Sequence, residues 1–418
     1  MNEEKKLVPK LRFPEFRWTG EWRLAPLNQL AKRTKKKNRD ETITRVLTNS
    51  AEFGVMDQRD FFDKDIATQG NLESYYVVEL GSYVYNPRIS STAPVGPISK
   101  NKVGTGVMSP LYTVFKFKDD GNEFYEHYFK TTGWHTYMRQ ASSTGARHDR
   151  MAISSDDFMA MPMPVSSPAE QQKIADCLSS LDELIAAQAR KVDALKTHKK
   201  GLMQQLFPRE GETQPRLRFP EFRDAGEWER QTVEDFGRVV TGNTPSTAQP
   251  AFYGGGIPFV SPADISDLRF VNETKTTLTT DGFAETRHIR AGSTLFVCIG
   301  STIGKVAQNI RDCATNQQIN AVVPSPKHSD GFVYFALSFA SGRIALLAGK
   351  QAVPIINKSL FSSVQLLVPQ LPEQQRIADC LSSLDALIFA ATQELEDLQT
   401  HKKGLMQQLF PALDETPK

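Results

Sequence analysis

The chain repeats itself at a distance of about 205 residues. Residues 11–22 read LRFPEFRWTGEW and residues 217–228 read LRFPEFRDAGEW, so 10 of 12 positions match at an offset of 206. Residues 170–208 and 373–411 match at 28 of 39 positions, at an offset of 203. Solenoid repeats are only about 20–50 residues long, so this period excludes a solenoid. The sequence therefore describes one unit that is present twice: a leading segment, a variable block and a helix.

The two variable blocks differ from each other although their borders are nearly identical. The identical borders indicate that the two repeats have the same function. The different sequences of the two blocks indicate that each block acts on a different target. We divide the chain into a leading segment at 1–22, a first block at 23–166, a first helix at 167–208, a linker with the repeated leading segment at 209–228, a second block at 229–370, a second helix at 371–411 and a tail at 412–418.

The end of each repeat predicts a long helix. Its apolar residues advance by alternating four and three, which gives an a/d seam over five heptads and favours a coiled coil. The seam positions are Ile174, Leu178, Leu181, Ile185, Gln188, Val192, Leu195, Lys199, Leu202 and Leu206, then Ile377, Leu381, Leu384, Ile388, Ala391, Leu395, Leu398, Lys402, Leu405 and Leu409. Residues 167–170 match a capping box with Pro168 at the first helical position, Pro372 starts the second helix, and Pro208 and Pro411 end the two helices.

Each helix is expected to have about 38 residues and a length of roughly 57 Å. Since both helices belong to one chain and a globular block separates them, an antiparallel pair with a block at each end is predicted. A heptad seam alone would also suit simple dimerisation or a core stripe. Gly201 and Gly404 cost about 1 kcal/mol each relative to Ala, and predict a close helix approach or a local break.

Both variable blocks are predicted to be compact α+β domains. In the first, β-branched and aromatic residues predict strands at 75–78, 83–85 and 112–115; in the second, they predict strands at 257–260, 294–297 and 319–323. Helices are predicted at 122–139 and 330–348. The fold class is therefore α+β, with two globular domains separated by a pair of long antiparallel helices and related by an internal pseudo-two-fold repeat.

Composition limits the setting of the protein. The chain has 50 basic and 48 acidic residues, and this net charge of +2 excludes a histone-like protein but not a locally basic face. No apolar run approaches the roughly 18–20 residues that span a bilayer, and the start MNEEKKLVPK does not have the apolar core of a secretion signal. The four cysteines form no C-x-x-C pair, which argues against zinc and against disulfides. A cytoplasmic protein without a membrane partner is expected.

Basic and amide-rich clusters in the loops predict contact with DNA. Residues 32–39 read KRTKKKNR, residues 142–150 read SSTGARHDR, and the second block contains TGNTP, GSTIGK and NQQ. Arg, Lys, Asn and Gln pair with base edges, and glycine-rich loops let the backbone approach phosphate. For any one cluster, a merely solvated loop is the alternative. The candidate DNA contacts are Lys35, Lys36, Lys37, Arg39, Arg88, Thr144, Arg147, His148, Arg150, Thr241, Asn243, Thr244, Ser301, Thr302, Lys305, Asn316, Gln317 and Gln318.

No catalytic centre is predicted. Residues 300–305 are one residue short of a phosphate-binding loop and do not have its Ser/Thr. Residues 85–88, YNPR, only partly match the tetrapeptide of amino-methyltransferases, and the seven scattered His suggest no metal site. A methyltransferase or nuclease is therefore the weaker alternative. A pure coiled-coil scaffold is a third interpretation, which leaves the two unlike blocks unexplained.

Over essentially its whole length the chain resembles the specificity subunit of type I restriction–modification enzymes. The resemblance is carried by the paired LRFPEF…GEW segments, the paired EQQ(K/R)IADCLSSLD helices and the KKGLMQQLFP ends. In the second block TGNTPS…IPFVSPADI…GSTIGK…TNQQINAV, and in the first SPLYTVFK…ARHDRMAISSDDF, are similar to target recognition domains of that family.

The resemblance implies a non-catalytic, sequence-specific DNA-binding subunit. Each block would be a target recognition domain that reads one half of a bipartite, asymmetric site in double-stranded DNA. The helices would set the spacing and dock two modification (methyltransferase) subunits, which bring S-adenosylmethionine. Restriction subunits would bring ATP hydrolysis, Mg and the nuclease, so that this chain itself binds no cofactor and no metal.

Overall fold

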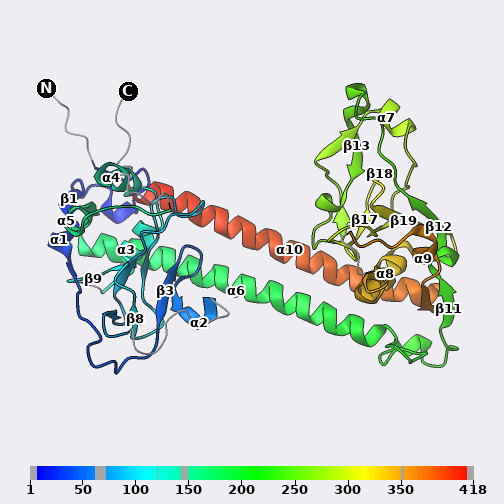
Figure 1. The fold of residues 1–418 in the computed structure, drawn as a ribbon, viewed down its shortest axis with the longest axis horizontal. Coiled ribbons are helices and arrows are strands. Elements are labelled where there is room, and N and C mark those ends of the chain that lie inside the picture. Colours follow the sequence, from blue (N-terminus) through cyan, green and yellow to red (C-terminus); the bar gives the residue numbers. More distant parts are fainter. Residues whose placement is uncertain (1–6, 62–71, 120, 143–148, 350–352, 412–418) are drawn as a thin grey trace. The chain divides into compact units, whose positions relative to one another are not determined.

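The computed structural model describes residues 7–61, 72–119, 121–142, 149–349 and 353–411. The chain is α+β, as predicted from its sequence, and it divides into two compact units (Figure 1). The first unit comprises residues 1–187 and 395–418, and the second comprises residues 188–394. The boundary between the units crosses both long helices, so each unit contains one β-rich domain and a part of each helix.

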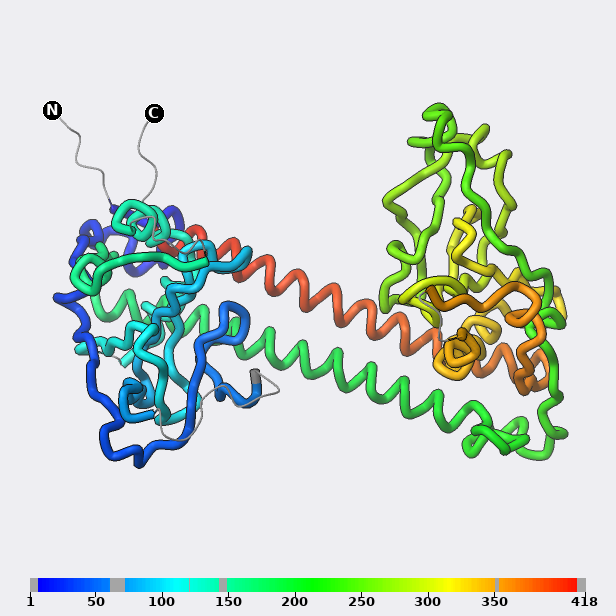
Figure 2. The backbone as a smooth tube through the Cα atoms, viewed as in Figure 1, coloured from blue at the N-terminus to red at the C-terminus, as the bar shows by residue number. Residues whose placement is uncertain are grey.

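The two long helices are α6 (Pro168–Leu206) and α10 (Leu371–Leu409), and each has 39 residues. Both run without interruption through Gly201 and Gly404 (Figure 2). A Cβ atom at either glycine would meet no heavy atom within 4 Å apart from the helix's own backbone. The expected close approach or break at these glycines is therefore wrong: they lie on an open part of the helix surface.

The predicted capping box of α6 is only half formed. The Glu170 backbone N–H donates to Ser167 Oγ over 3.3 Å, but the Glu170 side chain does not turn back to the cap. It accepts hydrogen bonds from Arg12 and Trp22 instead. The carboxylate is buried, and a guanidinium partner with two parallel bonds is stronger than a single backbone N–H.

The helices pack antiparallel within each unit. In the second unit Lys199 of α6 binds Asp385 of α10, whereas the earlier α6 residue Gln188 donates to the later α10 residue Ala391 over 2.9 Å. In the first unit Lys402 binds Asp182. Every predicted seam position is buried or half-buried, which confirms the seam that the heptad pattern predicted.

The first domain is built on a four-stranded antiparallel sheet, in the order β2-β9-β6-β7. These strands are β2 (Ala31–Arg33), β9 (Thr113–Phe117), β6 (Tyr83–Tyr85) and β7 (Ile98–Lys100). Three antiparallel pairs complete the strands: β1 (Arg23–Pro26) with β10 (Pro162–Val165), β3 (Leu47–Ser50) with β4 (Gly54–Asp57), and β5 (Tyr76–Val78) with β8 (Gly106–Met108). The helices are α1 (Leu27–Leu30), α2 (Gln58–Phe61), α3 (Phe124–Phe129), α4 (His135–Ala141) and α5 (Ser155–Met159).

The second domain contains a five-stranded sheet in the order β12-β19-β16-β17-β14. These strands are β12 (Gly237–Thr241), β19 (Ile319–Pro324), β16 (Thr294–Val297), β17 (Val306–Asn309) and β14 (Phe270–Val271). A three-stranded sheet joins β15 (Thr276–Leu278), β13 (Tyr253–Val260) and β18 (Ala314–Thr315), and β11 (Glu229–Thr232) pairs with β20 (Gln365–Val368). The helices are α7 (Thr280–Ala284), α8 (Asp330–Ala345) and α9 (Lys358–Ser362).

The two domains share one core topology although their sequences differ. The first sheet pairs its strands as β2-β9-β6-β7, and the second pairs the strands in the same chain positions as β12-β19-β16-β17, antiparallel throughout. In each domain an antiparallel pair, β1-β10 or β11-β20, joins the first strand of the block to the last. The duplication therefore extends through the variable blocks, which their amino-acid sequences did not reveal.

The repeated leading segments anchor each domain to a helix N-terminus of its own unit. Arg12 forms two hydrogen bonds, 2.6 and 2.7 Å long, with the buried Glu170 at the start of α6. Arg218 does the same with Glu373 in α10, over 2.8 and 2.7 Å. The cores follow the same plan: buried residues of the first domain cluster with Ile174 and Leu178 of α6, and those of the second cluster with residues of α10.

Candidate nucleic-acid interface

Three polar loops of the second domain leave the sheet at the same edge. Thr241, where β12 ends, is paired with Asn320 near the start of β19, and Val297, where β16 ends, is paired with Ile319. The loop between β16 and β17 begins and ends beside them. Because neighbouring antiparallel strands begin and end in turn at one edge, the loops 242–247, 298–305 and 316–318 lie next to one another.

Hydrogen bonds between these loops hold several of the candidate side chains in place. Thr244 Oγ1 donates to Gln317 Oε1 over 2.9 Å, and Thr241 Oγ1 donates to Asn320 Oδ1 over 2.6 Å. Asn316 Nδ2 donates to Gln318 Oε1 over 3.0 Å, and the Gln318 amide reaches the Ile299 carbonyl over 3.3 Å. Bound in this way, the amides present a preorganised set of donors and acceptors.

Gly242 allows the first loop to lie against the third. A Cβ atom at this position would come within 2.2 Å of the carbonyl oxygens of Thr315 and Asn316. No larger residue fits without moving the backbone of the 316–318 loop. The glycine in the TGNTP sequence is therefore a packing requirement for this edge.

The remaining candidates of this domain lie in the loop between β16 and β17. Ser301 and Lys305 are exposed, and Thr302 is half-buried. Lys305 Nζ donates to the Ile265 carbonyl over 2.9 Å, which fixes the position of its positive charge beside the loop.

The first domain places its candidates on the corresponding edge. β2 ends opposite Phe115, the Thr34 backbone N–H donates to the Val114 carbonyl, and β6 ends opposite Thr113. The loop that follows β2 carries the exposed Lys35, Lys36, Lys37 and Arg39. The loop that follows β6 carries the exposed Arg88. This edge is thus basic, whereas the same edge of the second domain is rich in amides.

Arg88 and Arg150 are brought together by the backbone. The two residues form an antiparallel bridge, and both guanidinium groups approach the Asp149 carboxylate, over 4.0 and 3.7 Å. Thr144, Arg147 and His148 lie outside the described residues. Lys36 reaches Glu79 at 3.6 Å, but both side chains are more than half exposed, so this pair is screened and leaves the lysine accessible.

Two features of the second domain were not predicted from the sequence. Arg287 is exposed, donates to the Thr241 carbonyl over 2.7 Å and offers its backbone N–H to Asn243 Oδ1. The segment from residue 353 to 356 pairs with the loop between β16 and β17, as the segment around Arg150 does with Arg88. The RHIR sequence at 287–290 was a signal for the first; the second depends on distant pairing and had no local signal.

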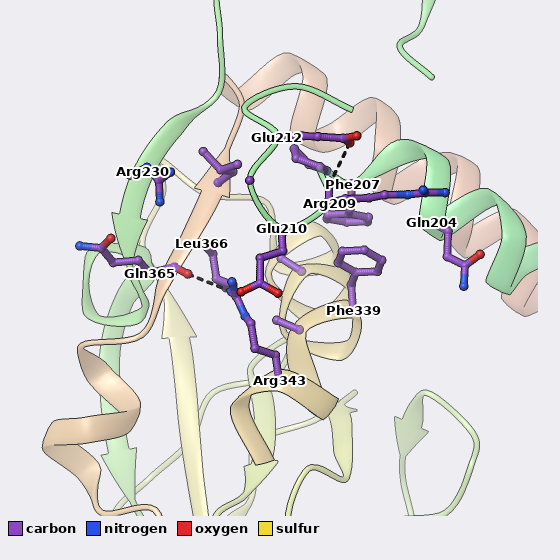
Figure 3. Close-up of a pocket in the computed structure, with 15 residues that line it drawn as sticks. Gln204, Phe207, Arg209, Glu210, Glu212, Arg230, Phe339, Arg343, Gln365 and Leu366 are labelled. Carbon is purple, nitrogen blue, oxygen red and sulfur yellow. Dashed lines mark hydrogen bonds between the residues drawn. The ribbon is translucent and has the colours of Figure 1, made fainter. Parts of the chain in front are cut away.

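A cavity of about 570 Å³ lies elsewhere in the second unit, at the end of α6 (Figure 3). Phe207, Phe339 and Leu366 form its apolar wall, and Arg343 donates to the Gln365 carbonyl over 3.1 Å beside Glu210. The fifteen residues that line it include no Ser, Thr, Cys, His or Lys. The lining therefore offers no hydroxyl or thiol nucleophile and no histidine base.

Three further features of the described residues concern metal ligands, membrane-spanning helices and cysteine nucleophiles. Over the ranges that the structure covers, no three His, Cys, Asp or Glu side chains gather in a way that could hold a metal ion. No helix in the described part of the chain is both long and apolar enough to cross a membrane. Burial raises the pKa of the Cys298 and Cys313 thiols to about 12 each, so both remain protonated at neutral pH and are poor nucleophiles.

The fold and the loop edges define a class: a duplicated α+β protein whose two domains present different polar edges from one scaffold. Comparison with known proteins agrees. Residues 225–399 match the family described as the type I restriction modification DNA specificity domain. Through these residues the chain is similar to the DNA specificity domains of type I restriction–modification systems.

Individual relatives are similar over parts of their length. The HindI specificity subunit of Haemophilus influenzae is 31% identical over 147 residues, which is 34% of this chain and 32% of the relative. The EcoR124I/EcoR124II specificity subunit of Escherichia coli is 29% identical over 259 residues, 59% of this chain and 61% of the relative. The matches thus span between one third and three fifths of these relatives.

Two solved structures share the fold over nearly the whole chain. The S subunit of the type I restriction–modification system from M. genitalium is 14% identical, with a TM-score of 0.60 over 98% of this chain and all of that one. A chain from a structure of type I system assembly is 16% identical, with a TM-score of 0.55 over 94% of this chain and 98% of that one.

Proposed function

We propose that this chain is the sequence-reading subunit of a type I restriction–modification complex. Each domain reads one half of a bipartite, asymmetric site in double-stranded DNA, and the helix pair sets the distance between the halves. One observation supports this most directly: a single sheet topology occurs twice and carries unlike polar loops at the same edge. A duplicated scaffold with exchanged edge residues suits two different half-sites.

Within this proposal the candidate residues have different roles. Arg147, Arg150, Asn243, Lys305 and Gln317 contact base edges or nearby phosphates, since these side chains match donors and acceptors in the major groove. To reach DNA, Lys305 has to give up its bond to the Ile265 carbonyl. Lys35, Lys36 and Lys37 supply charge that is independent of sequence. The hydrogen bonds that hold the side-chain amides of Gln317 and Gln318 in place lower the conformational entropy lost on binding DNA.

The catalytic steps belong to partners in this proposal. Two modification subunits dock on the helices and bring S-adenosylmethionine, and restriction subunits bring ATP, Mg and the nuclease, all in the cytoplasm. The chain alone is then expected to be silent in methyl transfer and in cleavage. Incubating rigorously pure chain with DNA and labelled S-adenosylmethionine checks this, and methylated DNA in that reaction would favour a methyltransferase instead.

Exchange of one domain tests the reading function. We expect that replacing residues 229–370 by the corresponding block of another specificity subunit changes one half-site and leaves the other intact. Mapping of methylated positions in DNA from cells that carry the variant with its partner subunits gives the result. The matched control is the exchange of residues 23–166, which should change only the opposite half. A change in both halves from either exchange would contradict the proposal.

A further inference from the structure

The differences between the two repeated helices are concentrated in one heptad. Residues 174–182 are identical to 377–385, and residues 197–208 are identical to 400–411. Between them, residues 188–194 read QARKVDA and residues 391–397 read ATQELED, so seven consecutive positions all differ. Random divergence would spread its changes over the helix.

The Lys–Asp ion pairs between the helices outside this heptad do not distinguish one copy of the helix from the other. Lys199 binds Asp385 in the second unit, and Lys402 binds Asp182 in the first. Asp182 and Lys199 of α6 correspond to Asp385 and Lys402 of α10 at the repeat offset of 203 residues. Each helix therefore carries both the Asp and the Lys of this ion pair. An antiparallel pair of two α6 helices from different chains, or of two α10 helices, would form these same contacts.

Within the divergent heptad, residues face their own counterparts. Gln188 donates to the Ala391 carbonyl over 2.9 Å, and Lys191 lies 3.9 Å from Glu394. In both pairs the partners are separated by 203 residues, the length of the repeat. A pair of identical helices would therefore place identical residues opposite each other at these positions, as any two-fold contact does.

The observed residues are complementary only when the two copies differ. Gln188 is buried, fits against the small Ala391, and donates from the same Nε2 to Glu394 Oε2 over 2.8 Å. A pair of two α6 helices would place two Gln188 side chains in the space that one Gln188 and one Ala391 fill in this chain. It would also place the two Lys191 side chains opposite each other. Two α10 helices would place Ala against Ala, leaving a gap, and Glu against Glu. Buried polar residues and opposed charges are known to select partners in paired helices.

We propose that residues 188–194 and 391–397 form a pairing code that makes α6 pair with α10 of the same chain and rejects a second copy of the same helix. Gln188, Lys191, Ala391 and Glu394 are its determinants. The code has a role during synthesis. Because α6 ends at Leu206 and α10 ends at Leu409, α6 of one nascent chain is exposed to α6 of another before its own partner helix has been made. This inference does not depend on the DNA-reading function.

The proposal is tested with equalised variants, in which both helices of the chain carry the same heptad sequence. One variant replaces 188–194 by ATQELED, and another replaces 391–397 by QARKVDA. The matched control exchanges both heptads, which keeps the composition and every complementary pair. A protease site in the linker at Gly211, where a Cβ atom would meet nothing within 4 Å, allows the folded full-length chain to be cut after purification.

Light scattering of the uncut chains and native mass spectrometry of the cut ones give the result. We expect the parent and the exchanged control to be monomeric, and their cut halves to pair almost entirely as unlike halves. The equalised variants should form dimers between chains, with unlike pairs falling at least tenfold relative to like pairs. The proposal is overturned if an equalised chain is as monomeric as the parent and its halves keep their pairing, or if the exchanged control behaves like the equalised chains.

A second measurement isolates the charge. Lys191→Glu and Glu394→Lys each place like charges together, and the double variant restores an opposite pair. We expect each single variant to lower the midpoint of urea unfolding of the full chain, and the double variant to recover most of the loss. Additive losses in the double variant would contradict a direct pairing of these two residues.

Discussion

At the scale of single residues, each domain contacts the same helix positions through a different side chain. Ser179 and Asp182 of α6 recur as Ser382 and Asp385 of α10. In the first unit His127 lies 3.1 Å from Ser179 Oγ and 3.9 Å from Asp182. In the second unit the buried Arg269 donates to Ser382 Oγ over 2.7 Å and lies 3.7 Å from Asp385. The same Ser and Asp positions of the repeated helix therefore bind a different side chain in each of the two unlike domains.

His127 should make stability depend on pH. Burial, followed by the nearby Lys130 and Lys402, lowers the pKa of His127 to about 4, against about 6.5 in an unfolded chain. The unfolded state therefore binds the proton more readily, so this contribution is complete above pH 6.5 and is lost as the pH falls toward 4. The loss amounts to about 3 kcal/mol at most. Urea unfolding at several pH values measures it, and His127→Gln should flatten the slope in this window.

The three exposed lysines of the first domain should act through charge alone. We expect the triple change of Lys35, Lys36 and Lys37 to Gln to weaken binding to every DNA sequence. The salt dependence should also fall, by about 0.9 in log–log slope for each phosphate that is no longer neutralised. Binding titrations of the partnered complex at several salt concentrations measure this. Changing the exposed Lys196 and Lys200 of α6 to Gln is the control. A shift in the methylated sequence would contradict the assignment.

At the scale of elements, buried ion pairs join each leading segment to a helix. Arg12 and Glu170, like Arg218 and Glu373, have side chains less than 10% exposed. The Trp22 indole adds a hydrogen bond to Glu170 over 3.0 Å. The repeated LRFPEF sequence supplies the arginine and the helix supplies the glutamate, so the same Arg–Glu pair forms in each unit. The indole bond is not repeated, because the buried Trp228 Nε1 has no hydrogen-bond partner among the described residues.

Breaking this joint should be costly. Arg218→Ala leaves the Glu373 carboxylate buried without its partner, and we expect a loss of about 3–5 kcal/mol in the free energy of unfolding. Arg216→Ala is a matched control two residues away: its pair with Glu212 is 53% and 35% exposed and should contribute below about 1 kcal/mol. Denaturant titration compares the two. Equal losses would mean that burial of the Arg218 pair does not determine its contribution.

At the scale of the whole molecule, two continuous helices and two polar loop edges belong to one chain. Under the proposed function, the length of the helices sets the number of unread base pairs between the half-sites. Reading domains on one face of the duplex are expected about one helical turn apart, roughly 10 base pairs. Both helices have the same number of residues, so a change in spacing requires equal changes in both.

Adding one heptad to each helix, beside Gln188 and Ala391, keeps the seam in phase and lengthens each by about 10.5 Å. At about 3.4 Å per base pair this equals roughly 3 base pairs. We expect a longer gap between unchanged half-sites, or loss of binding because a rotation of about 100° about the duplex is not absorbed. Methylation mapping measures the gap. An unchanged gap with full activity would show that the helices do not set it.

The sequence by itself determined the features that depend on local pattern or on repetition. The heptad spacing from Ile174 to Leu206 predicted α6 and its seam, since each position depends on neighbours three and four residues away. The strands at 83–85 and 294–297 were also predicted, because β-branched and aromatic residues mark them locally. The loop clusters were found through their composition, although their shared edge was not visible.

Only the tertiary structure decided which segments meet. The strands β2 and β9 are 3 and 5 residues long and are separated by 79 residues, so no local pattern specifies their pairing or reveals that it repeats as β12 and β19. Likewise Arg269 docks on Asp385 because cation, carboxylate and the Phe335 ring, 4.6 Å away, are buried together. Such contacts depend on close packing and on the removal of water from the side chains. Both arise only when segments that are distant in the sequence come together in the fold.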